Sequence, residues 1–411
     1  MRHSKMRQSE ERGSPDHSLR VYSDITQLIA GPENPTPLVR LNRINTSTRF
    51  KIYLKLERYN PFGSIKDRIA LAMLDSLEPG SRTVIEPSSG NTGIALTCLA
   101  NARGTRIEIA IPEKVPDEKK VMLRFLGAGL READDSLCPL FPTEGARGLV
   151  RAMLESPATR DEYVSPNQYE NELNLLAHYR MTGPEIWRQT GGAIGLFFAG
   201  FGTCGTITGI GRYLKEQNPA IRVVGVEPAS KEHKLPGMKR ISGLDKEFVP
   251  GILDRSVIDD VVDVTDEQAY GTAIDLARKE GIPVGPTTGA ILHAALEYAR
   301  SSSGLAVVIS PDDAFKYASF YREVLEKEAA VPAESTHDLS GLICPLSKIR
   351  ATALVDDLME GETASIILGD VDSLKSVAQE LKARGLRAGF RRENEARFVI
   401  TVTRPPRGPT A

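Results

Sequence analysis

The sequence is poor in cysteine, in net charge and in long uncharged apolar runs. Its 411 residues include four cysteines, which stand far apart and form no Cys-x-x-Cys pair. Four such cysteines in a chain of this length are not a disulfide framework, so we expect a reducing, cytoplasmic compartment. Lysine and arginine number 52 against 54 aspartates and glutamates, which leaves a formal net charge of -2. Near-neutrality gives no reason to expect nucleic acid or an anionic membrane as the main partner.

Segments typical of secretion or membrane insertion are also missing from the sequence. The longest uncharged stretch, residues 189–211, contains eight glycines, which suits a buried strand and a loop better than a lipid-facing helix. Residues 1–20 are polar and of mixed charge, so we expect a disordered tail there rather than a signal peptide. A second tail is expected at residues 405–411. With 41% hydrophobic and 26% charged residues, the composition is that of a globular protein, and a length of 411 residues suggests two or three domains.

Between residues 21 and 326, short apolar runs alternate with helical stretches. The runs expected as strands are residues 52–56, 83–87, 107–112, 195–200, 222–228 and 305–310. The stretches expected as helices between them include residues 66–77, 93–104 and 207–218. Such alternation predicts an α/β fold built on parallel strands.

A change of composition near residue 327 predicts a second folding unit. Residues 327–337 are small and polar with one proline, as in a linker. After them we expect a helix at 345–361, a strand at 363–368, a helix at 371–384 and a strand at 397–403. Residues 338–404 are therefore predicted to form a small two-layer α/β domain.

The first chemical motif is the lysine segment at residues 60–68 (NPFGSIKDR). Taken alone, a lysine followed by Asp67 and Arg68 is a solvated charge cluster. Here a proline and a glycine force a turn, after which Lys66 opens a helix. Partial desolvation and the positive end of the helix both favour the neutral amine, which attacks an aldehyde to form a Schiff base.

The second motif, residues 88–93 (SSGNTG), joins a predicted strand to a predicted helix. It can be an ordinary turn with a helix cap. Alternatively, its free backbone N–H groups and the hydroxyls of Ser88, Ser89 and Thr92 can bind a carboxylate at the helix N-terminus.

The third motif, residues 200–206 (GFGTCGT), contains the dinucleotide fingerprint Gly-x-Gly-x-x-Gly. That fingerprint also includes an acidic residue at the end of the next strand, and Glu227 occupies this position. A nucleotide-dependent oxidoreductase therefore competes with a loop that cups a single phosphate monoester. The other two motifs decide between these readings. A Schiff-base lysine, a carboxylate cradle and a phosphate cup are together what a pyridoxal phosphate enzyme needs.

Residues 22–324 resemble the cysteine synthase (O-acetylserine/O-phosphoserine sulfhydrylase) family of fold-type II pyridoxal phosphate enzymes. The resemblance rests on the three motifs and on residues 166–171 (PNQYEN), 178–187 (HYRMTGPEIW) and 285–290 (GPTTGA). It implies two lobes of parallel or mixed sheet with flanking helices, pyridoxal 5'-phosphate as cofactor and a homodimer. No metal is expected.

The same resemblance implies the site residues. Lys66 forms the Schiff base and acts as general base. The implied cofactor-binding residues are Lys66, Asn91, Gly202, Thr203, Cys204, Gly205, Thr206 and Thr287. The implied substrate-binding residues are Ser88, Ser89, Asn91, Thr92 and Gln168. Cys204 stands where the family more often has glycine or threonine, and residues 311–317 (PDDAFKY) depart from the usual family ending.

The reaction that the resemblance implies is β-replacement on O-acetylserine or O-phosphoserine through an aminoacrylate. A sulfur nucleophile, which is sulfide, thiosulfate or a protein persulfide, then adds to give L-cysteine or a related β-substituted alanine. A β-eliminating lyase or dehydratase with a regulatory C-terminal domain is the second reading, and an NAD-type oxidoreductase is the third. In the basic stretch 231–240, Lys239 or Arg240 is the candidate to hold the phosphate of O-phosphoserine.

Residues 338–350 (DLSGLICPLSKIR) resemble the TusA/SirA-like sulfur-carrier family through a Gly-Leu-x-Cys-Pro core. In that family the cysteine carries a persulfide, which would make Cys344 the sulfur donor to the enzyme. Cys344 also precedes a predicted helix, whose dipole lowers the pKa of a thiol. Ser347 replaces the second proline of the family motif. The other cysteines, Cys98, Cys138 and Cys204, are expected to be structural.

Overall fold

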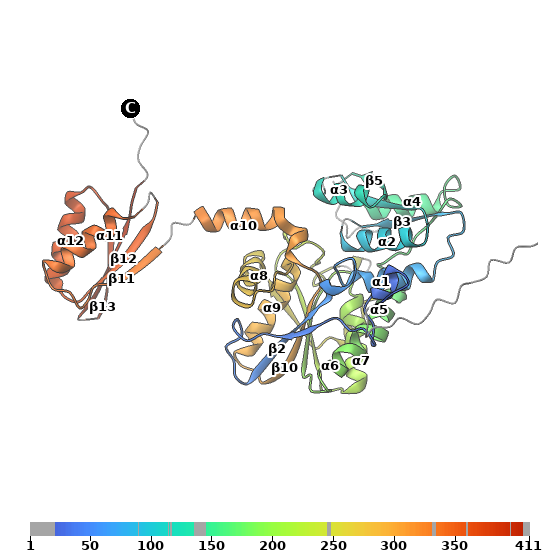
Figure 1. Ribbon diagram of the computed structural model, residues 1–411, viewed down its shortest axis with the longest axis horizontal. Coiled ribbons are helices and arrows are strands. Elements are labelled where there is room, and N and C mark those ends of the chain that lie inside the picture. The colour runs from blue at the N-terminus through green and yellow to red at the C-terminus, as the bar shows by residue number, and fades with distance from the viewer. Residues whose placement is uncertain are drawn as a thin grey trace, which may run out of the picture. The chain divides into compact units, whose positions relative to one another are not determined.

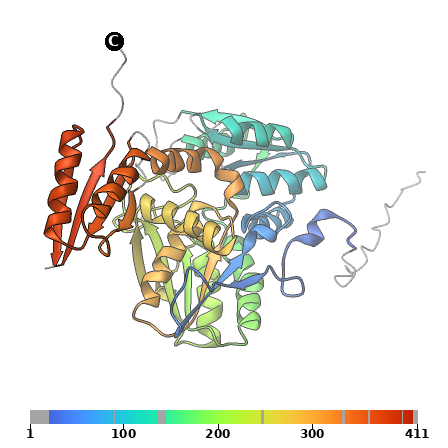
Figure 2. The ribbon, with the colours of Figure 1, turned by 60° about the vertical axis from the view of Figure 1, so that its left-hand side comes forward.

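The computed structural model describes residues 21–88, 90–113, 115, 117–134, 145–244, 248–330, 334–358, 361–394 and 396–405. The chain divides into two compact units, Met1–Ala318 and Ser319–Ala411. The first unit has two lobes, and the predicted α/β class is confirmed (Figures 1 and 2). The predicted tail at 1–20, most of the tail at 405–411, Ser89 and Cys138 lie outside the described residues.

In the part of the chain that the structure describes, the small lobe is a four-stranded parallel sheet in the order β5-β4-β3-β6. Its strands are β3 (Thr83–Pro87), β4 (Ile107–Pro112), β5 (Gly129–Ala133) and β6 (Tyr163–Val164). Its helices are α1 (Lys66–Asp75), α2 (Asn91–Ala102), α3 (Asp117–Phe125), α4 (Gly145–Glu155) and α5 (Glu172–Ala177). The inner strands β3 and β4 are mostly buried, as expected of parallel strands covered by helices on both faces.

The large lobe is a mixed sheet in the order β1-β2-β10-β7-β8-β9, of which β1 alone runs antiparallel among its described strands. The strands are β1 (Leu38–Arg40), β2 (Phe50–Leu56), β7 (Leu196–Gly200), β8 (Arg222–Pro228), β9 (Asp260–Val264) and β10 (Gly304–Ser310). The helices are α6 (Gly183–Gln189), α7 (Gly205–Gln217), α8 (Asp266–Glu280) and α9 (Pro286–Ala299). Trp187 of α6 packs against the apolar core of this lobe, and its ring lies over Gly192.

A buried ionic network fixes helix α1 to the large lobe. Arg68, in the first turn of α1, binds Glu57 with its Nε at 2.7 Å and Glu185 of α6 with its Nη1 at 2.5 Å. Lys55 of β2 binds the same Glu185 at 2.6 Å. All four side chains are fully buried. The network therefore fixes the start of α1, where Lys66 lies.

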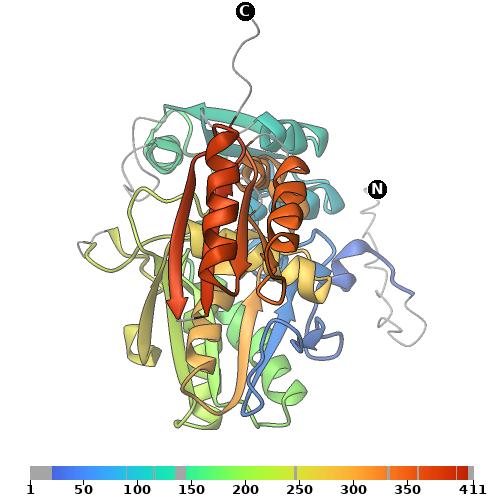
Figure 3. The ribbon, with the colours of Figure 1, turned by 90° about the vertical axis from the view of Figure 1, so that its left-hand side faces the viewer.

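The C-terminal unit includes α10 (Ala318–Ala330) from its second residue onward and contains a sheet in the order β11-β12-β14-β13. Its strands are β11 (Glu334–Asp338), β12 (Thr363–Leu368), β13 (Ala388–Asn394) and β14 (Arg397–Thr403). Helices α11 (Leu346–Asp356) and α12 (Val371–Ala383) cover one face of this sheet (Figure 3). The two-layer arrangement agrees with the prediction, although α11 ends at Asp356 and does not reach residue 361.

The predicted linker at 327–337 differs from what the structure shows. Residues 327–330 complete α10, and residues 334–337 belong to β11. A composition of small and polar residues with one proline does not distinguish a linker from a helix end followed by an edge strand. Strand β13 was not predicted either, since all of its residues are exposed and its sequence does not alternate between apolar and polar.

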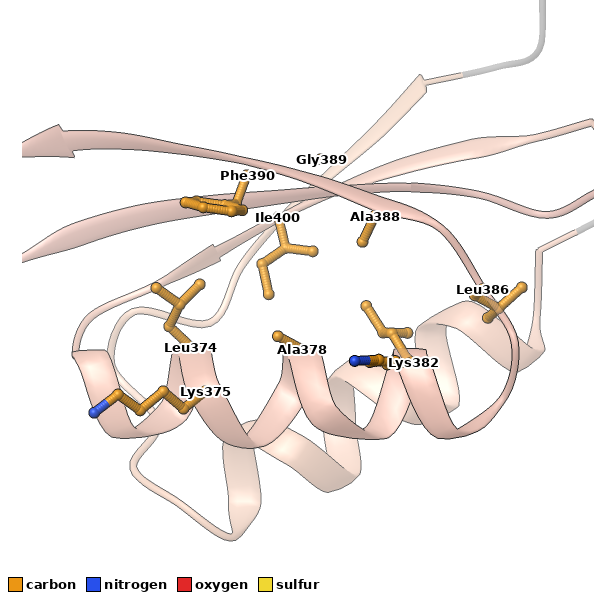
Figure 4. A pocket seen from close by; sticks show the side chains of 10 residues that line it. Leu374, Lys375, Ala378, Lys382, Leu386, Ala388, Gly389, Phe390 and Ile400 are labelled. Carbon is orange, nitrogen blue, oxygen red and sulfur yellow. The ribbon is translucent and has the colours of Figure 1, made fainter.

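An apolar groove of about 410 Å³ lies between α12 and β13 (Figure 4). Leu374 and Ala378 line it from the helix, and Ala388 and Phe390 line it from the strand. Phe390 is 80% exposed, because β13 is the edge strand and α12 does not cover it. Among the described residues, no helix is both long and apolar enough to cross a membrane.

Candidate active site

The turn before Lys66 is held by contacts with its own helix. Gly63 has a φ of +77°, in the left-handed region that glycine adopts without steric cost. The carboxylate of Asp67 accepts the backbone N–H of Phe62 at 2.6 Å and the hydroxyl of Ser64 at 3.2 Å. Lys66 is the first residue of α1, as predicted. Its side chain therefore starts from a fixed backbone.

The surroundings of Lys66 favour its neutral form. Burial lowers the pKa of Lys66, and the charge of Asp312 is the largest influence that opposes this effect. Desolvation disfavours the ammonium more than the amine. A larger fraction of free amine makes the side chain a better nucleophile toward an aldehyde. This is the electrostatic setting that a Schiff-base lysine requires.

The 88–93 loop connects the end of β3 with the start of α2. The Ser88 hydroxyl oxygen accepts the backbone N–H of Gly93 at 3.0 Å. The Thr92 hydroxyl donates to Oε1 of Gln168 at 2.8 Å. Thr92 and Gln168 were predicted from segments far apart in the sequence, and the structure brings them together.

The glycine loop between β7 and α7 forms a cradle for an anion. A Cβ on Gly202 would lie 2.7 Å from the carbonyl oxygen of Gly237, and one on Gly205 would lie 2.0 Å from Oδ1 of Asn174. Cys204 adopts a left-handed conformation, with a φ of 69°, at the N-cap of α7. The first backbone N–H groups of this 13-residue helix have no acceptor within the helix. The positive end of the helix dipole also lies at the glycine loop, so both favour an anion there. These residues fit the phosphate of pyridoxal phosphate.

Two polar side chains behind this cradle were not singled out from the sequence. Asn174 donates to Oγ1 of Thr203 at 3.0 Å. His178 lies 3.2 Å from Oγ1 of Thr206 through Nε2 and 3.0 Å from Oγ1 of Thr182 through Nδ1. Burial lowers the pKa of His178 to about 3, so the ring is neutral. His178 and Thr182 are four residues apart, which places both on one helix face, and this spacing is the sequence signal that could have identified the contact between them.

Asn91 is bonded on both sides of its amide. Its Nδ2 donates to Oδ2 of Asp312 at 2.6 Å, and its Oδ1 accepts from Nζ of Lys316 at 3.0 Å. Lys316 also donates to the carbonyl oxygens of Gly63 at 3.0 Å and Phe62 at 3.1 Å. One ammonium thus joins Asn91 to the lysine turn.

Thr287 lies in the first turn of α9, and its hydroxyl donates to the carbonyl oxygen of Pro236 at 3.3 Å. The neighbouring Gly237 is the residue that approaches Gly202 of the glycine loop. The 236–237 segment therefore joins Thr287 to the phosphate cradle.

The backbone N–H of Lys239 donates to the carbonyl oxygen of Phe201 in the glycine loop at 2.8 Å. Two cations lie over the ring of Tyr169, the residue after the predicted active-site glutamine: Cζ of Arg147 is 4.2 Å from the ring centroid and Nζ of Lys239 is 4.3 Å from it. Burial raises the pKa of Cys204 to about 12, and the charge of Lys239 is the largest opposing influence. Arg240 forms an ion pair with an aspartate 3.1 Å away.

The described cysteines differ in exposure. Cys98 is partly buried, Cys204 is buried and Cys344 is exposed. Sγ of Cys344 lies 3.5 Å from Oγ of Ser376, and the cysteine stands two residues before α11 begins. It is flanked by exposed apolar side chains, namely Ile343, Leu346 and Ile349.

Comparisons with known proteins agree with the geometry of the first unit. Residues 29–312 match the family model described as pyridoxal-phosphate dependent enzyme. A cysteine synthase from Aquifex aeolicus is 42% identical over 295 residues, which cover 69% of this chain and 88% of that protein. A hydrogen sulfide-producing enzyme from Fusobacterium nucleatum has a TM-score of 0.64 at 32% identity, covering 72% of this chain and 100% of that one. O-ureido-L-serine synthase gives a TM-score of 0.65 at 33% identity, covering 73% and 94%.

Proposed function

The chain belongs to the family of pyridoxal-phosphate dependent enzymes, and from this premise we propose that it replaces the β-substituent of an O-activated L-serine with sulfur to yield L-cysteine. The chain is a pyridoxal phosphate-dependent enzyme of the β-replacement type. The observation that carries the substrate proposal is the set of contacts that joins the loops after β3, β7 and β10. Asn91 binds Asp312, and Thr92 binds Gln168, which Asn174 links to Thr203. One loop suits a carboxylate, one suits a phosphate, and the third contacts the lysine turn.

Each group has a task in this reaction. Bound pyridoxal phosphate supplies an electron sink for the bond that breaks at Cα of the amino acid. Lys66 accepts the Cα proton at Nζ and later returns it. The first-turn N–H groups of α7, with Thr203 and Thr206, would hold the cofactor phosphate. Thr92 and Gln168 would orient the substrate carboxylate.

Replacing the lysine tests the proposal directly. Lys66→Ala should abolish the visible absorption band of the bound cofactor and lower the β-replacement rate by about 10³-fold or more. Lys279→Ala, which removes an exposed lysine paired with Asp275, is the matched control and should change neither. Product identity is read by mass spectrometry. A band that survives in the Lys66 variant would contradict the assignment.

Two other readings predict different results. A β-eliminating lyase would release pyruvate from the same substrate, without a sulfur-containing amino acid. The oxidoreductase reading needs Glu227 to bind a ribose hydroxyl. Glu227 is fully buried, and its carboxylate accepts the backbone N–H groups of Ile241 at 2.7 Å and Ser242 at 2.9 Å. Both bonds are accepted by Oε2, and Oε1 is buried as well, so the carboxylate is not open to a ribose hydroxyl, which disfavours the oxidoreductase interpretation.

For the leaving group, the position of Lys239 favours phosphate. Its charge reaches the glycine loop, and among the described residues it has no carboxylate within ion-pair distance. Lys239→Ala should lower kcat/KM for O-phosphoserine by about tenfold or more, with a smaller effect on O-acetylserine. Arg240→Ala is the control and should leave the ratio unchanged. A large preference of the unaltered enzyme for O-acetylserine would exclude this choice.

For the sulfur source, we propose that the C-terminal unit is a TusA-like carrier with Cys344 as its persulfide cysteine. Its exposure and apolar surroundings support this role, because a partner must reach the thiol. The terminal persulfide sulfur would form the bond to the β-carbon. A small thiol reductant would then cleave the S–S bond, releasing L-cysteine and the Cys344 thiol. Sulfide, thiosulfate or a persulfide-donating protein are the candidate primary donors.

Cys344→Ala should lose cysteine formation from a persulfide donor while keeping the rate with free sulfide. Cys98→Ala, a change of the same size in the partly buried α2, is the control. Equal loss with both donors in the Cys344 variant would contradict the carrier role. We also propose a homodimer in the cytoplasm, which light scattering and cell fractionation would test.

A further inference from the structure

One buried carboxylate beside the lysine turn has no task in the reaction above. Asp312 follows β10 and is only 2% exposed. Its Oδ2 accepts from Nδ2 of Asn91 at 2.6 Å and from the hydroxyl of Tyr317. Its Oδ1 is buried and has no hydrogen-bond partner among the described residues. Burial raises the pKa of Asp312, and a cation that lies close by for part of the time would oppose this rise by favouring the charged carboxylate.

The backbone places this carboxylate next to Lys66. Ser64 and Asp312 form an antiparallel bridge, and the N–H of Ile65 donates to the carbonyl oxygen of Pro311 at 2.9 Å. Lys66 follows directly after these two contacts. Burial lowers the pKa of Lys66, and Asp312 is the strongest influence that raises it. The two side chains are thus electrostatic neighbours.

Other charged or titratable groups also face the pair. The charge of Lys316 acts on Asp312, but its ammonium is committed to three oxygens, including Oδ1 of Asn91. Lys119 of α3 also experiences the charge of Asp312, and Asp313 acts on Asp312. The titratable neighbours of Lys66 itself include Cys204 and His178. Of the cations, Lys66 is the one whose protonation changes during the proposed reaction.

We propose that Asp312 is the counter-ion of Lys66 and, through the amide of Asn91, a positioning residue for the cofactor. This inference rests on the proposed function. When Nζ of Lys66 takes the proton from the substrate Cα, a C–H bond breaks, an N–H bond forms and an ammonium appears within the electrostatic influence of Asp312. The same proton leaves when Lys66 returns it. Asp312 stabilises the charged state without exchanging a proton itself.

Asp312→Asn in the full-length holoenzyme is the test. Asparagine keeps the size of the side chain and an oxygen for Asn91 and Tyr317, but it removes the charge. The pH midpoint of the visible absorption band of the cofactor on Lys66 should fall by about one unit, a tenfold change in the protonation equilibrium. The acidic limb of the pH-rate profile should move in the same direction. The absorption midpoint does not depend on which reaction the enzyme catalyses.

Asp313→Asn is the matched control, because it removes the same charge one residue away. Asp313 caps the next turn by accepting the N–H of Phe315 at 2.9 Å. Both midpoints should stay unchanged in this variant. If Asp312→Asn does not fold, Asp312→Ser makes the same test and leaves room for water. Midpoints that stay fixed in the folded Asp312 variant, or that shift equally in the Asp313 variant, would overturn the inference. A full shift without any cysteine formation would instead contradict the proposed function alone.

Discussion

At the scale of single residues, Cys204 shows how one backbone angle limits the side chains that the phosphate loop accepts. The left-handed conformation costs a residue other than glycine about 1–2 kcal/mol. Cysteine tolerates it because its Cβ carries only one heavy atom, and its burial in the large-lobe core supplies an offsetting gain. A branched Cβ lacks this tolerance.

Cys204→Val should therefore lower the free energy of unfolding by about 2 kcal/mol and weaken cofactor retention. Urea denaturation and absorbance after dialysis measure the two effects. Cys98→Val makes the same substitution inside α2 and should cost less than 1 kcal/mol. Equal losses in the two variants would show that the backbone angle is not the cause.

Motifs in the sequence located the residues that chemistry requires at fixed local spacing. Lys66 at its helix start and the glycine loop at the α7 N-terminus were predicted in this way. Sequence motifs could not identify Asp312 and Asn174, because each acts through a hydrogen-bond partner that is distant in the sequence. Residues 311–317 stood out only as a departure from the family pattern, which does not reveal what the segment contacts.

At the scale of elements, the start of α1 depends on the buried network of Arg68, Glu57, Glu185 and Lys55. Periodicity predicted α1 and its neighbours within about two residues. It did not predict this network, because the spacing of charged residues along the sequence does not tell which of them meet in three dimensions. Strand β13 escapes prediction for a different reason. An exposed edge strand has little alternation of apolar and polar residues in its sequence.

Glu185→Gln should destabilise the protein by about 3–5 kcal/mol, because Arg68 and Lys55 then share one remaining carboxylate in a buried place. Unfolding in urea gives the value. Glu267→Gln changes an exposed residue of α8 and should have little effect. A loss below about 1 kcal/mol in the Glu185 variant would mean that the network adds little to stability.

Glu86, in β3, predicts a pH effect. Burial raises the pKa of Glu86 to about 7, although its carboxylate accepts the N–H groups of Asn167 at 2.9 Å and Gln168 at 3.1 Å. Because the unfolded value is near 4.5, the native state binds more protons between these two pH values. Its contribution to stability is present at low pH and falls as pH rises through this window.

Glu86→Gln should therefore flatten the fall in unfolding free energy between about pH 4.5 and 7 by about 3 kcal/mol. Some slope should remain, because burial also raises the pKa of Asp67 to about 7. Glu113→Gln, which changes an exposed carboxyl after β4, is the control. Identical slopes in the Glu86 variant and the unaltered protein would argue against the shift.

At the scale of the whole molecule, the division at Ala318 separates the pyridoxal phosphate machinery from the unit that contains Cys344. Residues 29–312, which match the family, lie entirely within the first unit. Every described residue proposed to bind the cofactor also lies there. The catalytic unit should therefore fold without its neighbour.

A chain that ends at Ala330, the last residue of α10, should bind pyridoxal phosphate with an unchanged spectrum and keep its sulfide-dependent rate within about twofold. It should lose activity with a persulfide donor. The full-length Cys344→Ala variant is the control, since it keeps the unit and removes only the thiol. Unchanged activity of the shortened chain with every donor would favour a regulatory or structural role for the C-terminal unit.

The position of Trp187 has a practical consequence for such measurements. It is the only tryptophan of the chain, and it packs against the core of the large lobe. Its intrinsic fluorescence therefore reports on that lobe alone, because neither the small lobe nor the C-terminal unit has an indole. Tryptophan emission overlaps the absorption of a pyridoxal phosphate Schiff base, so energy transfer from Trp187 can follow cofactor loading. The protein thus carries a single-site optical reporter of cofactor binding without any added label.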